Sequence, residues 1–459
     1  MDTKGLETLL AVALVAALAP MVVAALPGPR IPQVVILILA GILIGPHVLG
    51  LADTSSVRLI ANVGLGFLFL LAGYELDPLL LREHAGKLAI AGWLISAAIS
   101  VGAVAALVSV GYVRDFIPIG LALTTTALGT LLPILHDNDM LSGRFGPYVL
   151  AAGAVGELFP IVAIALFLTH RKEFIAVASI VAVGVVAVLL TVVPRILSAS
   201  ALQTIVRQGR RATAQTTLRW AIVLLLVLLV AAAQFGLDVV LGALLAGMVL
   251  RSWTRRMGVD VSPLEEKLDA VGYGVFIPVF FVSSGMTLDI KSIAENPLRL
   301  LIFFALLLVV RGLPSLVVYR HTLPRRQRIE MTFITATTMP LLIALAEIGL
   351  SDGVMIPANA AALVGAGVLS VLVYPSIAVA LARRGRAAMA QPSTAAIGLG
   401  MAGDGGAVGA ARVAGEPGIA RESDAADDFG ASRAEDFGAS RAEDFGASRA
   451  EDFGASPAE

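Results

Sequence analysis

The sequence predicts an all-α integral membrane protein with about thirteen transmembrane helices, and three observations lead to this fold class. Hydrophobic residues make up 58% of the 459 residues and charged residues only 15%, whereas soluble domains have about 25% charged residues. Apolar runs of membrane-spanning length recur along most of the chain. Short motifs also return seven runs apart, which indicates two related halves. Too few polar side chains are present to cover a water-facing surface.

Apolar runs that are long enough to cross a membrane, separated by charged or turn-forming residues, define the predicted spans. They cover residues 6–26, 32–50, 58–75, 87–112, 116–136, 145–169, 174–194, 217–235, 237–251, 268–287, 298–319, 329–349 and 355–382. The first run is longer than the ~7–15 apolar residues of a secretory signal, and no basic segment precedes it. We therefore interpret residues 6–26 as the first transmembrane helix.

The distribution of Lys and Arg between the loops predicts the orientation of these spans, because cytoplasmic loops retain positive charge. One side of the predicted spans holds 20 Lys and Arg residues, including Arg383, Arg384 and Arg386 after the last span. The other side holds seven: Lys4, Arg58, Arg114, Arg171, Lys172, Lys291 and Arg299. We therefore expect a multi-pass protein of the cytoplasmic membrane, with the N-terminus outside and the C-terminus inside.

The composition changes after Arg386, and this change predicts two regions. Residues 1–387 carry 28 basic and 21 acidic residues, whereas residues 388–459 carry 5 basic and 13 acidic residues. The second region is rich in Gly, Ala and Ser and ends in an octapeptide repeat, Asp-Phe-Gly-Ala-Ser-Arg-Ala-Glu. One Phe per repeat cannot offset a backbone ordering cost of ~1–2 kcal/mol per residue. We expect a transmembrane domain over residues 1–387 and a disordered acidic tail over residues 388–459.

Several classes of protein are disfavoured by the composition. The chain has no cysteine, and its five histidines lack metal-ligand spacing, so disulfides, thiol chemistry and a metal enzyme are not expected. Residues 398–403 match G-x-G-x-x-G, but that motif binds nucleotides only between a strand and a helix, and here it lies in the low-complexity tail. We expect no enzyme activity, no cofactor, and neither nucleotide nor nucleic-acid binding.

Motifs that recur seven spans apart predict an inverted repeat. The matched motifs are Leu-Ala-Gly at residues 39–41 and 245–247, and Gly-x-x-Leu-Asp at residues 73–77 and 285–289. The fifth and twelfth spans also share a threonine cluster. Because seven is odd, the two halves, residues 6–169 and 217–383, are expected to have opposite orientations in the membrane, as in many secondary transporters.

The fifth and twelfth spans combine threonines with helix-breaking residues. The threonines are Thr124, Thr125 and Thr126 in the fifth span and Thr335, Thr337 and Thr338 in the twelfth, and the prolines are Pro133 and Pro340. An interrupted helix frees backbone carbonyls and helix ends, which is tolerated at membrane depth only beside a cavity. Threonine is also common in membrane helices, where it can bond its own backbone. The matched positions therefore carry the prediction of two discontinuous helices, one from each half, that meet near the middle of the bilayer.

Two ionisable residues lie near the middle of predicted spans: Glu157 in the sixth and Arg311 in the eleventh. A charge at the bilayer centre costs at least ~2.5–3.5 kcal/mol, so each is a functional-site hypothesis by default. A carboxylate at this depth can hold either a proton or a small monovalent cation, which would then compete for Glu157. The alternative is a permanent buried Glu157–Arg311 ion pair that carries no substrate. Four acids near span ends are interpreted as solvated interfacial charges: Glu75, Asp77, Asp289 and Glu347.

Longer motifs carry a resemblance to a known family. They are Gly41-Ile42-Leu43-Ile44-Gly45-Pro46 with Leu49-Gly50, the stretch from Gly64 to Gly73 followed by Glu75-Leu76-Asp77, and the stretch from Pro278 to Met286. Residues 6 to about 383 resemble a monovalent cation:proton antiporter of the sodium/proton exchanger superfamily and are most similar to its Kef-like branch.

This resemblance implies a homodimer whose protomers use elevator-like alternating access about crossed, unwound helices. By position it places the two threonine clusters on the crossing helices, Glu157 on the acid that binds a proton or a monovalent cation, and Arg311 on the basic residue that faces it. The sequence departs from the family pattern at Glu157, where Asp is usual, and at Gly156, where members often have Asp or Asn. The repeat tail stands where many Kef-like members have a nucleotide-binding regulatory domain.

The function predicted is exchange of protons for sodium or potassium across the membrane, with a role in pH homeostasis. A single central carboxylate holds one proton or one cation, and arginine cannot lose its proton to act as a second carrier, so the exchange is expected to be electroneutral. Two alternatives stay open. One is an organic-anion symporter or uniporter on the same fold, with Arg311 as the substrate clamp, and the other is a membrane scaffold or sensor that does not transport.

Overall fold

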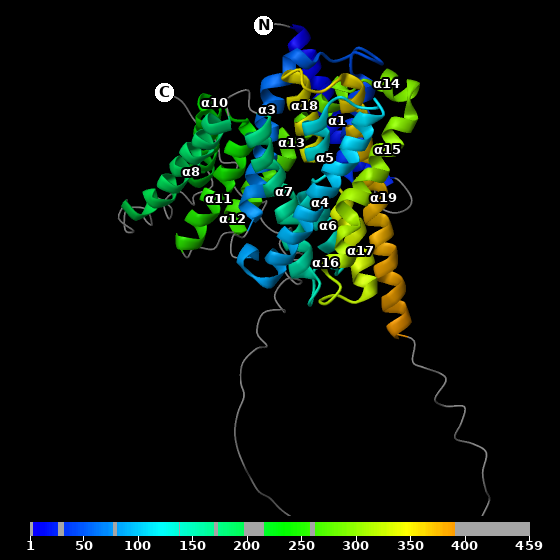
Figure 1. The fold of residues 1–459 in the computed structure, drawn as a ribbon. Coiled ribbons are helices and arrows are strands. Elements are labelled where there is room, and N and C mark those ends of the chain that lie inside the picture. The colour runs from blue at the N-terminus through cyan, green and yellow to red at the C-terminus, as the bar shows by residue number, and fades with distance from the viewer. Residues whose placement is uncertain are drawn as a thin grey trace, which may run out of the picture. The chain divides into compact units, whose positions relative to one another are not determined.

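The structure is a computed structural model that describes residues 3–25, 32–76, 80–136, 138–168, 173–196, 215–257 and 262–390. The regular structure of these residues is helical throughout (Figure 1). Residues Met1–Pro392 form one compact unit. Apart from its first three residues, which end the last helix, the predicted tail over residues 388–459 lies outside the described residues.

The helices begin and end as follows. They are α1 (Thr3–Ala25), α2 (Gln33–Ile44), α3 (Thr54–Glu75), η1 (Leu80–Arg82), α4 (His84–Ser109), α5 (Phe116–Ala122), α6 (Leu128–His136), α7 (Gly146–Phe167), α8 (Glu173–Ile196), α10 (Thr216–Gln234), α11 (Val239–Met257), α12 (Ser262–Val271), η2 (Gly272–Phe276), α13 (Ile277–Thr287), α14 (Ile290–Glu295), α15 (Pro297–Leu307), η3 (Leu308–Gly312), α16 (Pro314–Val318), α17 (Arg325–Ala336), α18 (Pro340–Ser351) and α19 (Pro357–Ala390). The short helix η1 is a 3₁₀-helix, whereas η2 and η3 are π-helices.

Nine stretches in the described part of the chain are long and apolar enough to cross a membrane, and two further apolar helices are shorter. Each of the thirteen predicted ranges is occupied by one to three successive helical elements. The shorter ones include α2, which ends at Ile44 because Gly45 precedes Pro46 and has extended backbone angles, as residues before proline usually do. The prediction of a multi-pass membrane protein is therefore confirmed, and the count of thirteen crossings stays a prediction.

The helices pack into two bundles, each built from both halves of the sequence. The first bundle comprises the described residues of 3–76 and 216–287, and the second comprises those of 84–167 and 297–390. Figure 1 shows α10 and α11 of the first bundle well separated from α15, α17 and α19 of the second. Helix α8 packs on α11 of the first bundle and on α7 of the second.

Glycines allow unusually close approach of helices in the first bundle. A Cβ atom added to any of four glycines would lie too close to a carbonyl oxygen of the facing helix. For Gly41 the distance to Val282 O would be 2.2 Å, for Gly285 to Ile38 O 2.3 Å, for Gly73 to Leu244 O 2.1 Å and for Gly247 to Leu70 O 2.1 Å. Small residues permit such backbone contacts between membrane helices. Helix α2 therefore packs closely on α13, and α3 on α11, at the glycines of the two recurring motifs.

Two of the predicted spans are interrupted helices in the second bundle. Residues 123–127 separate α5 from α6, and residues 337–339 separate α17 from α18. The second interruption ends at Pro340, which begins α18. Proline is favourable there because the N–H of the first residue of a helix has no acceptor within the helix. The first interruption lies before α6 begins, and Pro133 is inside that helix. It lies at the threonines, where Thr124 Oγ1 donates to Leu121 O and so competes with the helical backbone pattern.

Candidate functional site

The two helix interruptions contact each other in the interior of the second bundle. The backbone N–H of Ala127 donates to Thr337 O at 3.0 Å, and the hydroxyls of Thr125 and Thr338 are 2.6 Å apart. All four residues are buried. Each interruption therefore supplies partners for polar groups that the other leaves outside a helix, as buried backbone groups require.

Helix α7 crosses beside this contact and brings Glu157 to it. Thr126 N–H donates to Gly156 O at 3.0 Å. Oε1 of Glu157 accepts hydrogen bonds from the N–H groups of Leu128 at 2.7 Å and Gly129 at 3.4 Å, in the first turn of α6. A helix N-terminus presents free N–H groups and a partial positive charge, both of which stabilise an anion.

The Glu157 side chain is only 7% exposed, and its two oxygens differ in their surroundings. Backbone donors hold Oε1, whereas Oε2 receives no hydrogen bond from the residues that the structure describes. A buried carboxylate with one oxygen fixed and the other without a protein donor can take up a proton or a cation at the second oxygen. The residue predicted as the ion-binding acid therefore lies at the meeting point of the two interruptions.

Arg311 is 3% exposed and contacts the same cluster without pairing with Glu157. Its Nε donates to Thr126 Oγ1 at 2.8 Å, and its Nη2 donates to Ala152 O on α7 at 2.9 Å. Within the described residues, no carboxylate lies within the 4.0 Å of an ion pair with this guanidinium. The alternative of a permanent Glu157–Arg311 ion pair is therefore not what this conformation contains. The guanidinium is a positive charge held against α7, where its Nη2 would lie 2.7 Å from a Cβ atom at Gly156, the residue before Glu157.

The local backbone explains how Arg311 reaches the cluster. Pro314 lacks an N–H and begins α16, and the preceding turn widens into the π-helix η3, in which Leu313 N–H donates to Leu308 O, five residues back. Single π-turns inside α-helices are frequent at functional sites. Thr335 Oγ1 lies 3.2 Å from Arg311 O, so the altered turn is joined to α17 beside the second interruption.

The six predicted threonines are buried, but their hydroxyls support the interruptions and do not contact Glu157 in the described structure. Thr126 Oγ1 donates to Thr335 O at 2.7 Å, which joins the two broken helices. Thr124 and Thr337 donate back to carbonyls of their own helices.

Sequence reasoning missed several groups that complete the cluster. Ser370 on α19 accepts from Thr338 N–H at 3.1 Å and donates to Thr338 O at 2.8 Å, which satisfies both backbone groups of one interrupted residue. Ser315 Oγ lies 3.2 Å from Thr335 Oγ1. Each is an isolated serine in an apolar run, and this is the one signal that could have marked them. The amide donors of Leu128 and Gly129 have no side-chain signal at all.

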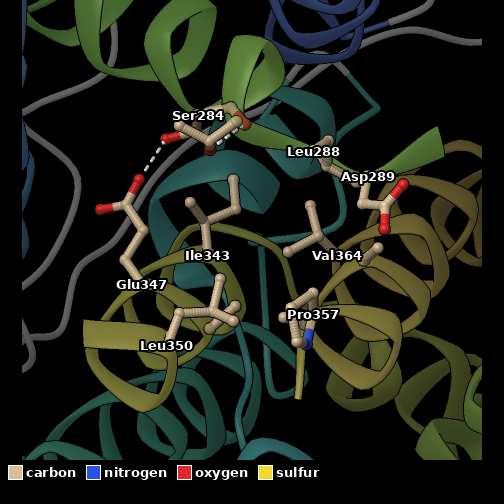
Figure 2. Close-up of a pocket in the computed structure, with 12 residues that line it drawn as sticks. Ser284, Leu288, Asp289, Ile343, Glu347, Leu350, Pro357 and Val364 are labelled. Carbon is tan, nitrogen blue, oxygen red and sulfur yellow. Dashed lines mark hydrogen bonds between the residues drawn. The ribbon is translucent and has the colours of Figure 1, made fainter. Parts of the chain in front are cut away.

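Glu347 also differs from its predicted role. It was interpreted as a solvated interfacial charge, but its side chain lines a small cavity, and Oε1 accepts a hydrogen bond from Ser284 Oγ at 2.9 Å (Figure 2). Ser284 is buried on α13. Asp289 lines the same cavity and caps α14 by accepting from Ser292 N–H at 3.2 Å. Glu347 is thus a partly exposed acid near a helix end that is also held by a serine of another helix.

Gly156 sets the distance between α7, Thr126 and Arg311, and this gives a testable expectation. A Cβ atom at this position would lie 2.6 Å from Thr126 Cβ and 2.7 Å from Arg311 Nη2. We expect Gly156→Ala to destabilise the protein by ~1–3 kcal/mol, as overpacking does, and to lower the transport rate strongly. Thermal unfolding in detergent and flux in proteoliposomes measure the two effects. The matched control is Gly102→Ala in α4, where a Cβ would meet nothing within 4 Å, and an equal effect of both changes would contradict the steric account.

Comparison with known proteins identifies the family of the chain. Residues 11–384 match the family described as sodium/hydrogen exchanger, transmembrane. The chain is 25% identical over 345 residues to the putative Na(+)/H(+) antiporter YjbQ of Bacillus subtilis (strain 168), which covers 70% of this chain and 54% of that protein. It is 24% identical over 308 residues to the glutathione-regulated potassium-efflux system protein KefC of Escherichia coli O81 (strain ED1a), which covers 63% of this chain and 47% of that protein. The matches thus span about half the length of these relatives.

A solved structure has the same fold. The sodium proton antiporter MjNhaP1 from Methanocaldococcus jannaschii at pH 8 superposes with a TM-score of 0.61 and 19% sequence identity, covering 83% of this chain and 98% of that one. The relatives are named as transporters and not as enzymes, as the sequence predicts. Because the family match covers most of the residues, the resemblance seen in the sequence is confirmed: the chain belongs to the sodium/hydrogen exchanger transmembrane family.

Proposed function

We propose that this protein exchanges protons for sodium or potassium across the cytoplasmic membrane, with Glu157 as the group that carries either ion. The observation that carries the proposal is the placement of Glu157. It is a buried carboxylate at the N-terminus of α6, at the contact of two interrupted helices, with Oε2 unbonded among the described residues. Isolated charges are costly in a membrane interior, so this oxygen favours occupancy by a proton or a cation.

The exchange follows from competition at one oxygen. When a proton leaves Oε2, the carboxylate becomes negative, and the N–H groups of Leu128 and Gly129 stabilise that charge through Oε1. The fixed guanidinium of Arg311 lowers the cost of the charge further without contacting it. A monovalent cation can then bind at Oε2, and its departure allows a proton to return. The threonine clusters keep the two interruptions open beside the carboxylate.

Alternating access by an elevator-like movement is the second part of the proposal. The division into two bundles supports it, since Glu157, Arg311 and both interruptions belong to the second bundle. The glycine contacts within the first bundle make that bundle suited to remain rigid. The inverted repeat is supported by those contacts as well, because an exchange of α2 with α11 and of α3 with α13 maps one glycine-packed pair onto the other.

The remaining assignments rest on the sequence. We propose a homodimer in the cytoplasmic membrane, with the N-terminus outside and the C-terminus inside, because the Lys and Arg residues gather on one side of the predicted spans. Residues 1–387 form the transport domain, with repeats over about 6–169 and 217–383, and residues 388–459 add an acidic tail without a predicted span.

The assay that tests this function is cation-driven proton movement. Purified protein in liposomes with an internal pH dye should release protons on addition of sodium or potassium, and lithium serves as a third cation. Release driven by an organic anion and by none of these cations would favour the symporter instead. The structure gives that alternative no support, because Nε and Nη2 of Arg311 already donate to Thr126 and Ala152. No flux with either class of substrate would favour a non-transporting scaffold or sensor.

The stoichiometry gives a further expectation. Glu157 is the carboxylate at the contact of the interruptions, and it can hold one proton or one cation, so the exchange should be electroneutral. Proton flux in sodium-loaded proteoliposomes should therefore stay constant when a potassium gradient with valinomycin imposes different voltages. A rate that changes systematically with voltage would mean that a second titratable group joins the cycle.

A further inference from the structure

A hydrogen bond joins the two bundles at some distance from Glu157. Ser284 Oγ donates to Glu347 Oε1 at 2.9 Å. Ser284 lies near the end of α13 in the first bundle, is 3% exposed, and belongs to the predicted tenth span. Glu347 lies on α18 in the second bundle. Figure 2 shows the two side chains pointing toward each other across the edge of the cavity.

The cavity beside this bond lies between the same two bundles. Its walls are the end of α13 from the first bundle and the helices α18 and α19 from the second, with Leu288, Ile343, Leu350, Pro357 and Val364 as apolar lining. By the predicted orientation this is the outer side of the membrane, since α19 begins here at Pro357 and runs toward the Arg-rich inner end. The bond therefore crosses the boundary along which an elevator-like movement would occur.

The other side-chain hydrogen bonds described for α13 and α18 stay local to one helix, as those of Thr287 to Ser284 O and of Ser351 to Ile348 O do. Bonds of neighbouring helices stay inside one bundle. Thr126 and Thr335 are joined within the second bundle, and so are Asp115 and Asn359, at 2.7 Å, near the outer end of α5 and α19. Among the described side-chain hydrogen bonds of α13 and α18, the bond between Ser284 and Glu347 is thus the one that connects the first bundle to the second.

Glu347 is coupled mechanically to the site. It lies in α18, which is continuous from Pro340 to Ser351 and begins directly after the interruption at residues 337–339. Glu347 lies seven positions after Pro340 in this helix, about 10 Å along the helix axis. A displacement of the second bundle that carries Glu157 must therefore carry Glu347 with it, away from Ser284 on the first bundle.

We propose that Ser284 and Glu347 form an outer latch: their hydrogen bond holds the outer side of the transport path closed in the conformation described, and it breaks in every transport cycle. The proposal rests on the proposed exchange function and adds a specific residue pair to it. A hydrogen bond to a carboxylate is stronger than one between two neutral groups. Such a bond is strong enough to bias two conformations and weak enough to break thermally.

Cross-linking tests the latch. Because the sequence contains no cysteine, a thiol reagent can react only with the cysteines that are introduced. We expect the double variant Ser284→Cys with Glu347→Cys to transport before treatment. After reaction with a short bifunctional methanethiosulfonate reagent, its rate should fall at least tenfold, and reductant should restore it. The matched control is Asp115→Cys with Asn359→Cys, a pair on the same side that lies within the second bundle, and its rate should be unchanged by cross-linking. Full transport by the cross-linked Ser284–Glu347 pair would overturn the latch.

A second measurement does not depend on transport and so separates failure of the latch from failure of the proposed function. Ile343 lines the cavity and is 1% exposed, so the single variant Ile343→Cys should react slowly with a membrane-impermeant maleimide applied from the outer side. Adding Ser284→Ala, which removes the hydrogen-bond donor, should increase the labelling rate several-fold. Adding Glu347→Gln, which retains an acceptor for Ser284, should increase it less. Equal labelling rates in all three proteins would overturn the latch even if exchange is confirmed. Faster labelling in a protein that shows no cation-driven proton release would support the latch but refute the exchange.

Discussion

Glu157→Gln is expected to abolish cation-driven proton exchange while leaving the protein folded and inserted in the membrane. The amide has nearly the same size as the carboxylate, and its oxygen can still accept from Leu128 and Gly129 N–H. It cannot bind and release a proton at neutral pH, and it lacks the negative charge that a cation requires. Flux in proteoliposomes should fall to the level of protein-free liposomes with sodium, potassium and lithium alike.

Two comparisons make this expectation decisive. Glu157→Asp retains the carboxylate on a shorter side chain and should keep part of the activity, with weaker cation affinity because its oxygens no longer reach the α6 amides in the same way. Elution profile and thermal unfolding should be similar for the Gln variant and the parent protein, which separates loss of chemistry from loss of fold. Exchange by the Gln variant at the parental rate would remove Glu157 from the mechanism.

The second large effect is expected at Arg311. Arg311→Met keeps much of the length of the side chain but removes the donors to Thr126 Oγ1 and Ala152 O and the positive charge beside α7. Leaving buried partners unsatisfied costs about 1–3 kcal/mol, so the unfolding temperature should fall. Loss of the compensating charge should also make the ionised form of Glu157 less favourable, and exchange should therefore fall by about tenfold or more, the effect of 1.4 kcal/mol on a rate.

Charge and packing can be separated at this position. Arg311→Lys restores the charge without the two-pronged hydrogen bonding of the guanidinium, and we expect a partial recovery of flux with little recovery of stability. The control is Arg328→Met in the first turn of α17, where Nη1 donates to Leu316 O but no contact with the site is described. If Arg328→Met reduces exchange as much as Arg311→Met, the effect is one of general stability and the compensating-charge role is wrong.

Local sequence properties determined the architecture to a large extent. Apolar runs of membrane length placed the helices because the bilayer core dictates span length and composition wherever a segment lies in the chain. The threonine clusters and Pro340 marked two interrupted helices because competition with backbone hydrogen bonding is a property of neighbouring residues. The cost of a charge at membrane depth singled out Glu157 and Arg311 for the same local reason.

Contacts between distant segments were decided by the tertiary structure alone. The amides that hold Glu157 come from residues 28 and 29 positions away, and Arg311 finds Thr126 across 185 positions and leaves Glu157 unpaired. The closeness of Gly156 to Arg311, and of Ser284 to Glu347, has no signature in either local sequence. Opposite charges in one apolar region suggested an ion pair, but which donor meets which acceptor depends on how the helices pack and where each buried polar group finds its best geometry. The sequence by itself therefore determined the membrane helices, the two interruptions and the central charges, while packing between distant helices decided how those charges are held and which contact joins the two bundles.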